Sequence, residues 1–248
     1  MRIIVWNCNM AFRNKAALLL AYDPDILVIP ECENPAALKF PASVKQPDSI
    51  LWHGNKLHKG LGVFAYNGYK LRLLPVHDPA LQTIIPVAVS KGRFKINLFA
   101  VWANNPSDTK NQYVGQLWKA IHLYDDIIQT KRTILAGDFN SNTIWDKPKR
   151  AGNHSDVVQV LGAKKISSAY HHHFKQTQGK EEHPSFYLYR HLDKPYHLDY
   201  CFASKDLMKK LTRAEMGSHE QWCAYSDHTP LIVDFEVGNI EHRMMNTE

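Results

Sequence analysis

Short apolar segments that end at a polar side chain recur along this chain, and this recurrence constrains the fold more than any other feature. The segments RIIVW, DILVIP and TILAG lead directly to Asn7, Glu31 and Asp138. β-Branched residues favour strands, whereas Asp and Asn disfavour them, so each segment is predicted to be a strand that stops near a polar residue. A chain with many such segments must bury several short strands in sheets.

Further β-rich segments extend this pattern. They are residues 60–66, 84–90, 94–102, 197–202 and 230–235. The fourth of these carries Asp199 inside the predicted strand, and the triplet SDH, which contains Asp227 and His228, precedes the last.

Helical patterns are fewer. Residues 14–22 end at Asp-Pro, and residues 114–128 place apolar side chains on one stripe at helical spacing. Residues 155–162 begin with a serine that suits an N-cap and end with a glycine that suits a helix stop. Many strands with a few amphipathic helices predict an α/β fold of two stacked sheets flanked by helices.

Composition narrows the class of protein. The chain has 248 residues, a net charge of +6 and four cysteines without CxxC spacing, so a structural zinc site is not expected. We expect four small buried thiols in a reducing compartment. No apolar run approaches the ~20 residues of a membrane span, and the first residues do not form a signal peptide. A cytoplasmic protein without membrane contact is the prediction.

The polar residues at the strand ends form a candidate site. They are Asn7, Glu31, Asp138, Asn140, Asp199, Asp227 and His228. Carboxylate and amide oxygens without cysteine suit a hard cation such as Mg²⁺ or Mn²⁺. A histidine with a carboxylate partner suits an oriented general base or an electrostatic group. Each residue alone has a structural explanation, such as a turn or a cap, but seven together indicate a site.

Five motifs then carry a resemblance to a known family. They are WNCN (6–9), PEC (30–32), GDFNS (137–141), HLDYCF (197–202) and SDHTPL (226–231). Their order and spacing resemble the endonuclease/exonuclease/phosphatase superfamily, which includes exonuclease III, abasic-site endonucleases, deoxyribonuclease I, inositol-phosphate phosphatases and sphingomyelinases. The resemblance implies a four-layered α/β sandwich over residues 1–236, followed by a C-terminal tail at 237–248.

The resemblance also implies roles for the metal-binding residues. Glu31 resembles the principal ligand of the divalent cation in this family. Asn7 and Asp227 resemble the residues that support the metal.

The remaining motif residues resemble the groups that act on the phosphate. Asp138 matches the residue that activates the attacking water or protonates the leaving oxygen, and Asn140 matches one that holds a phosphate oxygen. Asp199 would orient His228.

Two places depart from the family or add to it. Deoxyribonuclease I and the sphingomyelinases carry a second histidine after the strand at 94–102, where this chain has Trp102 and then Asn105. Exonuclease III has a tyrosine there, so the chain leans toward that branch. Trp102 and Asn105 are candidate substrate contacts, with core packing an equal alternative for Trp102.

A further local match is PSFYLYR, which resembles the segment that places an aromatic wedge in exonuclease III. Phe186 would be that wedge, with a core strand position as the equal alternative, and Arg190 would contact substrate.

Residues 53–60, 145–154 and 190–197 are basic segments that suit a groove along a nucleic-acid backbone. We therefore expect a Mg²⁺- or Mn²⁺-dependent phosphodiester hydrolase, most simply a nuclease that acts on DNA. The alternatives are a phosphatase or phosphodiesterase of a small-molecule or lipid head-group ester, and a catalytically inactive nucleic-acid-binding module. No family role is assigned to His154 or to the histidines at 171–173.

Overall fold

The computed structural model describes residues 1–81, 83–104, 112–129 and 131–237, and its strands form two sheets of six strands each. The order of the first sheet is β13 (Leu211–Met216), β14 (Leu231–Phe235), β1 (Arg2–Val5), β2 (Ile26–Cys32), β4 (Lys59–Ala65), β3 (Ser49–Lys56). The order of the second sheet is β5 (Lys70–Leu73), β6 (Ile84–Lys91), β7 (Phe94–Trp102), β8 (Thr133–Asp138), β12 (Asp199–Ser204), β9 (Ile166–Ser168). Within the sheets the β1–β2 and β7–β8 pairs are parallel and the others antiparallel, so both sheets are mixed.

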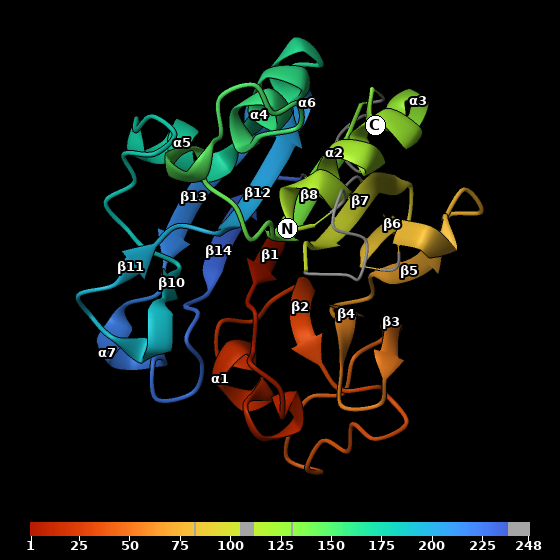
Figure 1. Cartoon of the computed structure of the whole chain (residues 1–248). Helices are drawn as coiled ribbons and strands as arrows, with labels where there is room; N and C mark the ends of the chain where they lie inside the picture. Colours follow the sequence, from red (N-terminus) through yellow and green to blue (C-terminus); the bar gives the residue numbers. More distant parts are fainter. Residues whose placement is uncertain (82, 105–111, 130, 238–248) are drawn as a thin grey trace.

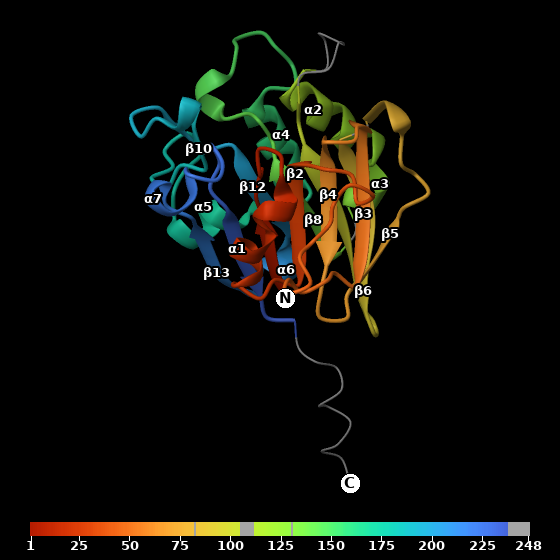
Figure 2. The ribbon, with the colours of Figure 1, turned by 90° about the horizontal axis from the view of Figure 1, so that it is seen from below.

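Short helices occur in the connections between the strands. They are η1 (Phe12–Asn14), α1 (Ala16–Leu20), η2 (Pro79–Leu81), α2 (Val114–Leu123), α3 (Asp125–Ile128), η4 (Thr143–Trp145), α4 (His154–Ala163), α5 (Ala169–Phe174), η5 (Leu188–Arg190), α6 (Lys205–Met208) and α7 (His219–Trp222). Figure 1 shows α1 at the foot of the molecule and α2, α3 and α4 at its top, with the sheets between them. Figure 2 gives the view turned by 90°. A small hairpin of β10 (Phe186–Tyr187) and β11 (Pro195–Tyr196) stands apart from both sheets.

The core is divided by the alternation of side chains along each strand. Ile3 of β1 faces the core between the sheets, whereas its neighbour Ile4 faces the helical side with Phe12 and Leu19. In the same way Phe99 of β7 packs in the core beneath α2 and α4. Three apolar layers separate four structural layers, which confirms the predicted four-layered sandwich.

Three predicted helices differ in detail from the observed ones. The stretch 114–128 is broken at Tyr124 into α2 and α3, where the phenol oxygen of Tyr124 accepts a hydrogen bond from the backbone of Asp78. The predicted Ser155 cap is wrong, because α4 is capped by Asn153 and Gly162 lies inside the helix. The helix predicted at 14–22 is shorter in the structure, where α1 covers Ala16–Leu20 and η1 at Phe12–Asn14 precedes it.

The strand ends also shift, and one shift matters for the site. Glu31 lies inside β2 rather than after it, at an irregularity between Pro30 and Cys32 where the pairing with β4 changes register. Its φ of 60° is a left-handed conformation, which turns the side chain out of the strand's regular alternation. The predicted basic loop at 53–60 is a hairpin formed by β3 and β4.

Gly137 is required where β8 approaches its end. Its φ is 149°, and a Cβ at this position would lie 1.8 Å from the carbonyl oxygen of Val101 on β7. Only glycine permits this close parallel packing, which sets the position of Asp138 next along the chain.

The four cysteines are buried and free, as predicted. Within the described part of the chain, every helix is too short or too polar to span a bilayer.

Candidate active site

A buried carboxylate–imidazole pair is the centre of the site. His228 Nδ1 lies 2.7 Å from Asp199 Oδ2, and both side chains are almost inaccessible to solvent. The hydroxyl oxygen of Ser185 accepts hydrogen bonds from the backbone of Leu198 and Asp199, which fixes the start of β12. Trp6 donates to the carbonyl oxygen of His228 and joins the segment before β14 to the end of β1. The predicted Asp199–His228 pairing is therefore present in the structure.

Asp138 joins this pair from the neighbouring strand. Asp138 and Asp199 are direct partners in the antiparallel register of β8 and β12. Asn7 Nδ2 donates to Asp138 Oδ2 over 3.0 Å, and the backbone N–H of Asn140 donates to Asp138 Oδ1 over 2.8 Å. Because Asn7 follows β1 and Asp138 ends β8, the first of these hydrogen bonds connects the two sheets at one edge.

Asp138, Asp199 and His228 form a compact cluster of charge. Their ligand atoms lie within 4.8 Å of one another, and in the described ranges no other such group of three or more His, Cys, Asp or Glu residues occurs. Burial, reinforced by the negative charge of Asp199, raises the pKa of Asp138 to about 7. Burial alone would lower the pKa of His228, but the Asp199 charge and hydrogen bond raise it to about 9. An imidazolium at neutral pH has no free lone pair, which argues against His228 as a metal ligand.

Two of the three residues predicted to hold a metal, Asn7 and Asp227, are linked through Asn9. Asp227 Oδ1 accepts a hydrogen bond from Asn9 Nδ2 over 3.1 Å, and Asn7 Oδ1 accepts one from the Asn9 backbone. Glu31 Oε2 lies 3.0 Å from Lys59 Nζ. All of these donor atoms are carboxylate or amide oxygens, which suits a hard divalent cation. In the structure Lys59 is the cation paired with this carboxylate.

The predicted substrate residues occupy different positions. The Phe186 ring lies 4.7 Å from the His228 ring and is half-buried at the mouth of the cluster. Trp102 is only 8 % exposed and packs between the sheets, with Lys59 Nζ 5.5 Å from its ring. A substrate on that side would therefore reach Lys59 more easily than the indole of Trp102. Arg190 is exposed and donates to the carbonyl oxygen of Ala224, whereas Asn105 lies outside the described residues.

Sequence reasoning missed several residues that hold the site together. Asn9 bridges Asn7 and Asp227, although it belongs to the WNCN motif that was recognised. Ser226 donates to the carbonyl oxygen of Asn7 and accepts from the backbone of His228. Ser226 is the first residue of the SDHTPL motif, but a serine before Asp-His does not indicate a contact with the distant N-terminal strand.

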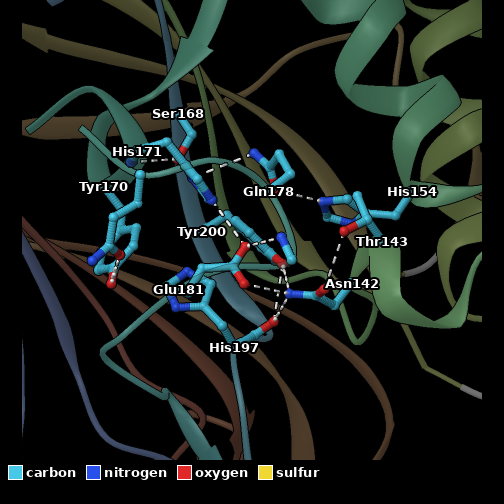
Figure 3. Close-up of polar contacts among 12 residues, drawn as sticks. Asn142, Thr143, His154, Ser168, Tyr170, His171, Gln178, Glu181, His197 and Tyr200 are labelled. Atoms are coloured by element: carbon cyan, nitrogen blue, oxygen red, sulfur yellow. Dashed lines mark hydrogen bonds and ion pairs between the residues drawn. The ribbon is translucent and has the colours of Figure 1, made fainter. Parts of the chain in front are cut away.

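A second polar cluster lies beside the site and contains His154 and His171, which had no assigned role (Figure 3). His172 and His173 are exposed. His171 Nε2 donates to Glu181 over 2.9 Å, and His154 contacts both Ser141 and Gln178. The phenol group of Tyr200 lies within hydrogen-bond distance of Asn142 and donates to backbone carbonyls. This cluster holds the chain after Asp138 against the segment that leads to Asp199.

Because the histidines of this cluster are buried, the free energy of unfolding should depend on pH in the acid range. Burial lowers the pKa of His154 and of His197 to about 4, whereas an exposed histidine in the unfolded chain has a pKa near 6.5. The unfolded chain therefore binds more protons between these values, and both residues reduce stability as pH falls from about 6.5 to 4. We expect His154→Gln to lose stability less steeply than wild type over this range, by up to roughly 1.4 kcal/mol per pH unit.

The measurement is urea unfolding of both proteins at matched pH values in chelator. The difference between the two plots of stability against pH isolates the contribution of His154. The raised pKa of Asp138 increases stability as pH falls, but it does so equally in both proteins. Parallel curves from pH 6.5 to 4 would contradict a neutral, buried His154.

The sequence and the fold of this chain are similar to those of known proteins. A model described as "Endonuclease/Exonuclease/phosphatase family" matches residues 4–228, and no curated protein matches. The 3'-5' exonuclease NExo from Neisseria meningitidis is similar in structure at 18% identity, 96% coverage of this chain, 100% coverage of that chain and a TM-score of 0.66. An AP endonuclease from Archaeoglobus fulgidus is similar at 14% identity, with the same two coverages and TM-score.

A third similar structure is the 3' phosphatase NExo from Neisseria bound to product DNA hairpin, at 18% identity, 96% and 100% coverage and a TM-score of 0.64. At these identities the structural likeness establishes the fold alone.

Proposed function

Because this chain belongs to the endonuclease/exonuclease/phosphatase family, we propose that it is a divalent-cation-dependent phosphodiester hydrolase that cuts DNA. The observation that carries the proposal is the Asp199–His228 pair beside Asp138, all three buried at one edge of the sandwich. Such a cluster is costly to bury and has no evident structural need, which favours a chemical role.

His228 is proposed to act on the phosphate as a fixed positive group. Asp199 Oδ2 holds its Nδ1, so the other ring nitrogen is available to donate to a phosphoryl oxygen as negative charge develops. Asp138 lies within reach of the same position and is the group proposed to take or give the proton. Asp138 accepts a hydrogen bond from the backbone N–H of Asn140, whose φ is 48°. The side-chain amide of Asn140 is proposed to bind a phosphate oxygen.

Mg²⁺ or Mn²⁺ is the proposed cofactor, held by Glu31 with Asn7 and Asp227. When bound, a divalent cation supplies charge neutralisation of the phosphodiester oxygens. The chain itself supplies an oxygen-only ligand set, with Asn9 orienting the side chain of Asp227.

DNA is the proposed substrate class because exposed basic side chains lie on two segments that also carry or follow site residues. Lys149 and Arg150 are exposed on the segment after β8, and Arg190 is exposed on the hairpin that carries Phe186. The similar 3' phosphatase that was solved with a product DNA hairpin supports the same class of substrate. The free thiols favour a reducing, cytoplasmic compartment.

Binding of DNA should depend on salt through these residues. We expect the double substitution Lys149→Gln, Arg150→Gln to flatten the slope of log affinity against log salt by about one to two units, since each phosphate contact releases about one counterion. The slopes are measured by fluorescence anisotropy with labelled DNA in chelator, at salt concentrations from about 50 to 200 mM.

The matched control is Lys209→Gln, Lys210→Gln, which removes the same charge from exposed positions after α6, at the opposite end of β12 from Asp199. Equal slopes for the two double variants would contradict a phosphate-binding segment at 145–154.

A substrate panel tests the proposed function as a whole. Labelled single-stranded, duplex and abasic DNA, RNA and inositol phosphates are incubated with Mg²⁺, Mn²⁺ or chelator. We expect metal-dependent cleavage of at least one DNA substrate. Release of phosphate from inositol phosphates without any DNA cleavage would favour the small-molecule alternative, and binding of DNA without hydrolysis would favour an inactive module.

A further inference from the structure

A hollow of about 170 Å³ lies beside the catalytic cluster, and the proposed mechanism does not use it. Ile144, Pro195 and Tyr196 provide apolar walls, whereas Asn142, Glu181 and His197 provide polar ones. Figure 3 shows these three polar residues gathered around Tyr200. The hollow therefore combines an aromatic wall with a small set of fixed polar atoms, as pockets for planar ligands do.

A row of aromatic rings connects this hollow to the catalytic histidine. The ring centroids of His228 and Phe186 are 4.7 Å apart, and those of Phe186 and Tyr196 are 6.3 Å apart. Trp145 continues the row, 4.9 Å from Tyr196, and remains 46% exposed. An exposed tryptophan at the end of such a row offers a free face on which a base can stack.

The polar wall of the hollow accepts hydrogen bonds and repels anions. Burial would raise the pKa of Glu181, but hydrogen bonds from His171 and from the backbone of Gly179 hold it at about 2, so the carboxylate is charged. Gly179 has a φ of 79°, and a Cβ there would lie 2.5 Å from Thr143 Oγ1, so the turn packs closely against η4.

His197 adds a second acceptor atom behind this wall, where the protein encloses it. Its Nδ1 donates to the carbonyl oxygen of His183, so in the neutral ring Nε2 carries a lone pair, and Nε2 has no hydrogen-bond partner among the described residues. A phosphate is excluded beside Glu181, whereas a neutral group with N–H donors is favoured.

We propose that the hollow is a nucleobase subsite, which takes an unpaired base of the bound strand against Tyr196 and Trp145 and presents Glu181 as acceptor to the base's amino group. This inference rests on the proposed nuclease function and names its substrate class: nucleic acid with unpaired nucleotides next to the cleaved phosphate. A base in a continuous duplex is paired through its amino group and cannot present it to Glu181.

The first test uses Trp145→Ala, with Leu123→Ala as a control that truncates an equally exposed apolar side chain on α2. Affinity in chelator is measured for a blunt DNA duplex and for the same duplex with three unpaired nucleotides at either end. Wild type and the control should prefer an extended duplex over the blunt one by roughly five- to hundredfold, the contribution of one stacked base. Trp145→Ala should lose most of this preference and bind the blunt duplex within twofold of wild type.

The second test uses Glu181→Gln, which keeps the size of the side chain but replaces one acceptor with a donor. Wild type should prefer extensions of adenine or cytosine over thymine, which has no amino group, and the variant should lose that preference. Thermal unfolding of each variant is measured to test whether the polar cluster remains folded. If Glu181→Gln does not fold, Trp145→Ala provides an independent result.

The outcomes separate this inference from the proposed function. Equal binding of blunt and extended duplexes by wild type, or an unchanged preference in Trp145→Ala, would overturn the nucleobase subsite even if DNA is cleaved. Failure of wild type to bind or cleave any DNA would instead overturn the nuclease function itself.

Discussion

Replacing His228 with alanine should lower the turnover number for DNA cleavage by about a hundredfold to ten-thousandfold, with little change in DNA affinity. His228 is buried, its Nδ1 is held by Asp199 over 2.7 Å, and the pair carries positive charge on the imidazole. A charge fixed in this way stabilises the transition state more than the bound substrate, because the phosphoryl oxygens gain negative charge only during the reaction.

Single-turnover cleavage and DNA affinity are the two measurements that separate these effects. Asp199→Asn should be nearly as harmful, because His228 would lose both its orientation and its favourable charge. The double variant should be little worse than either single variant, since the two residues act as one unit. Losses that multiply would contradict the pairing, and His122→Ala, an exposed histidine on α2, is the control.

The second large effect is expected at the metal site. Glu31→Gln keeps the shape of the side chain but removes the charge that attracts a divalent cation. Activity at low Mg²⁺ should fall by about a hundredfold or more, which corresponds to roughly 3 kcal/mol, and high Mg²⁺ or Mn²⁺ should restore part of it. Calorimetry with Mn²⁺ alone should show the same weakening without any substrate.

Lys59 provides the control for this substitution, because it forms an ion pair with Glu31. Loss of the ion pair alone is tested by Lys59→Met, which should bind Mn²⁺ at least as tightly as wild type. A Lys59→Met protein with the same weakened Mn²⁺ binding as Glu31→Gln would contradict the assignment of Glu31 as a metal ligand.

The parts of the fold that could be predicted are those whose pattern is local. β1, β8 and the second half of β7 each contain a continuous apolar run, and buried strands of this kind are recognised by composition. β5 and β13 are missing from the prediction because neither is well buried and each mixes charged with apolar residues. The four-residue helices α6 and α7 are too short to show a helical period.

The candidate site likewise has a part that could be predicted from local motifs and a part that could not. Asp138, Asp199 and His228 lie in motifs that resemble a family, so their proximity could be inferred before the structure. The ion pair of Glu31 with Lys59 and the stacking of Trp145 on Tyr196 join segments that are distant in sequence. Nothing in the local pattern encodes such contacts, because they depend on how the sheets and the hairpin are placed.

The most direct test of the central claim is cleavage of labelled DNA by wild type, His228→Ala and Glu31→Gln, each prepared in parallel and assayed across a Mn²⁺ series and in excess chelator. Wild type should cleave only with metal, Glu31→Gln should need far more metal, and His228→Ala should stay slow at every concentration. Undiminished cleavage by wild type in chelator, or equal rates for the three proteins, would contradict a metal-dependent hydrolase centred on the Asp199–His228 pair.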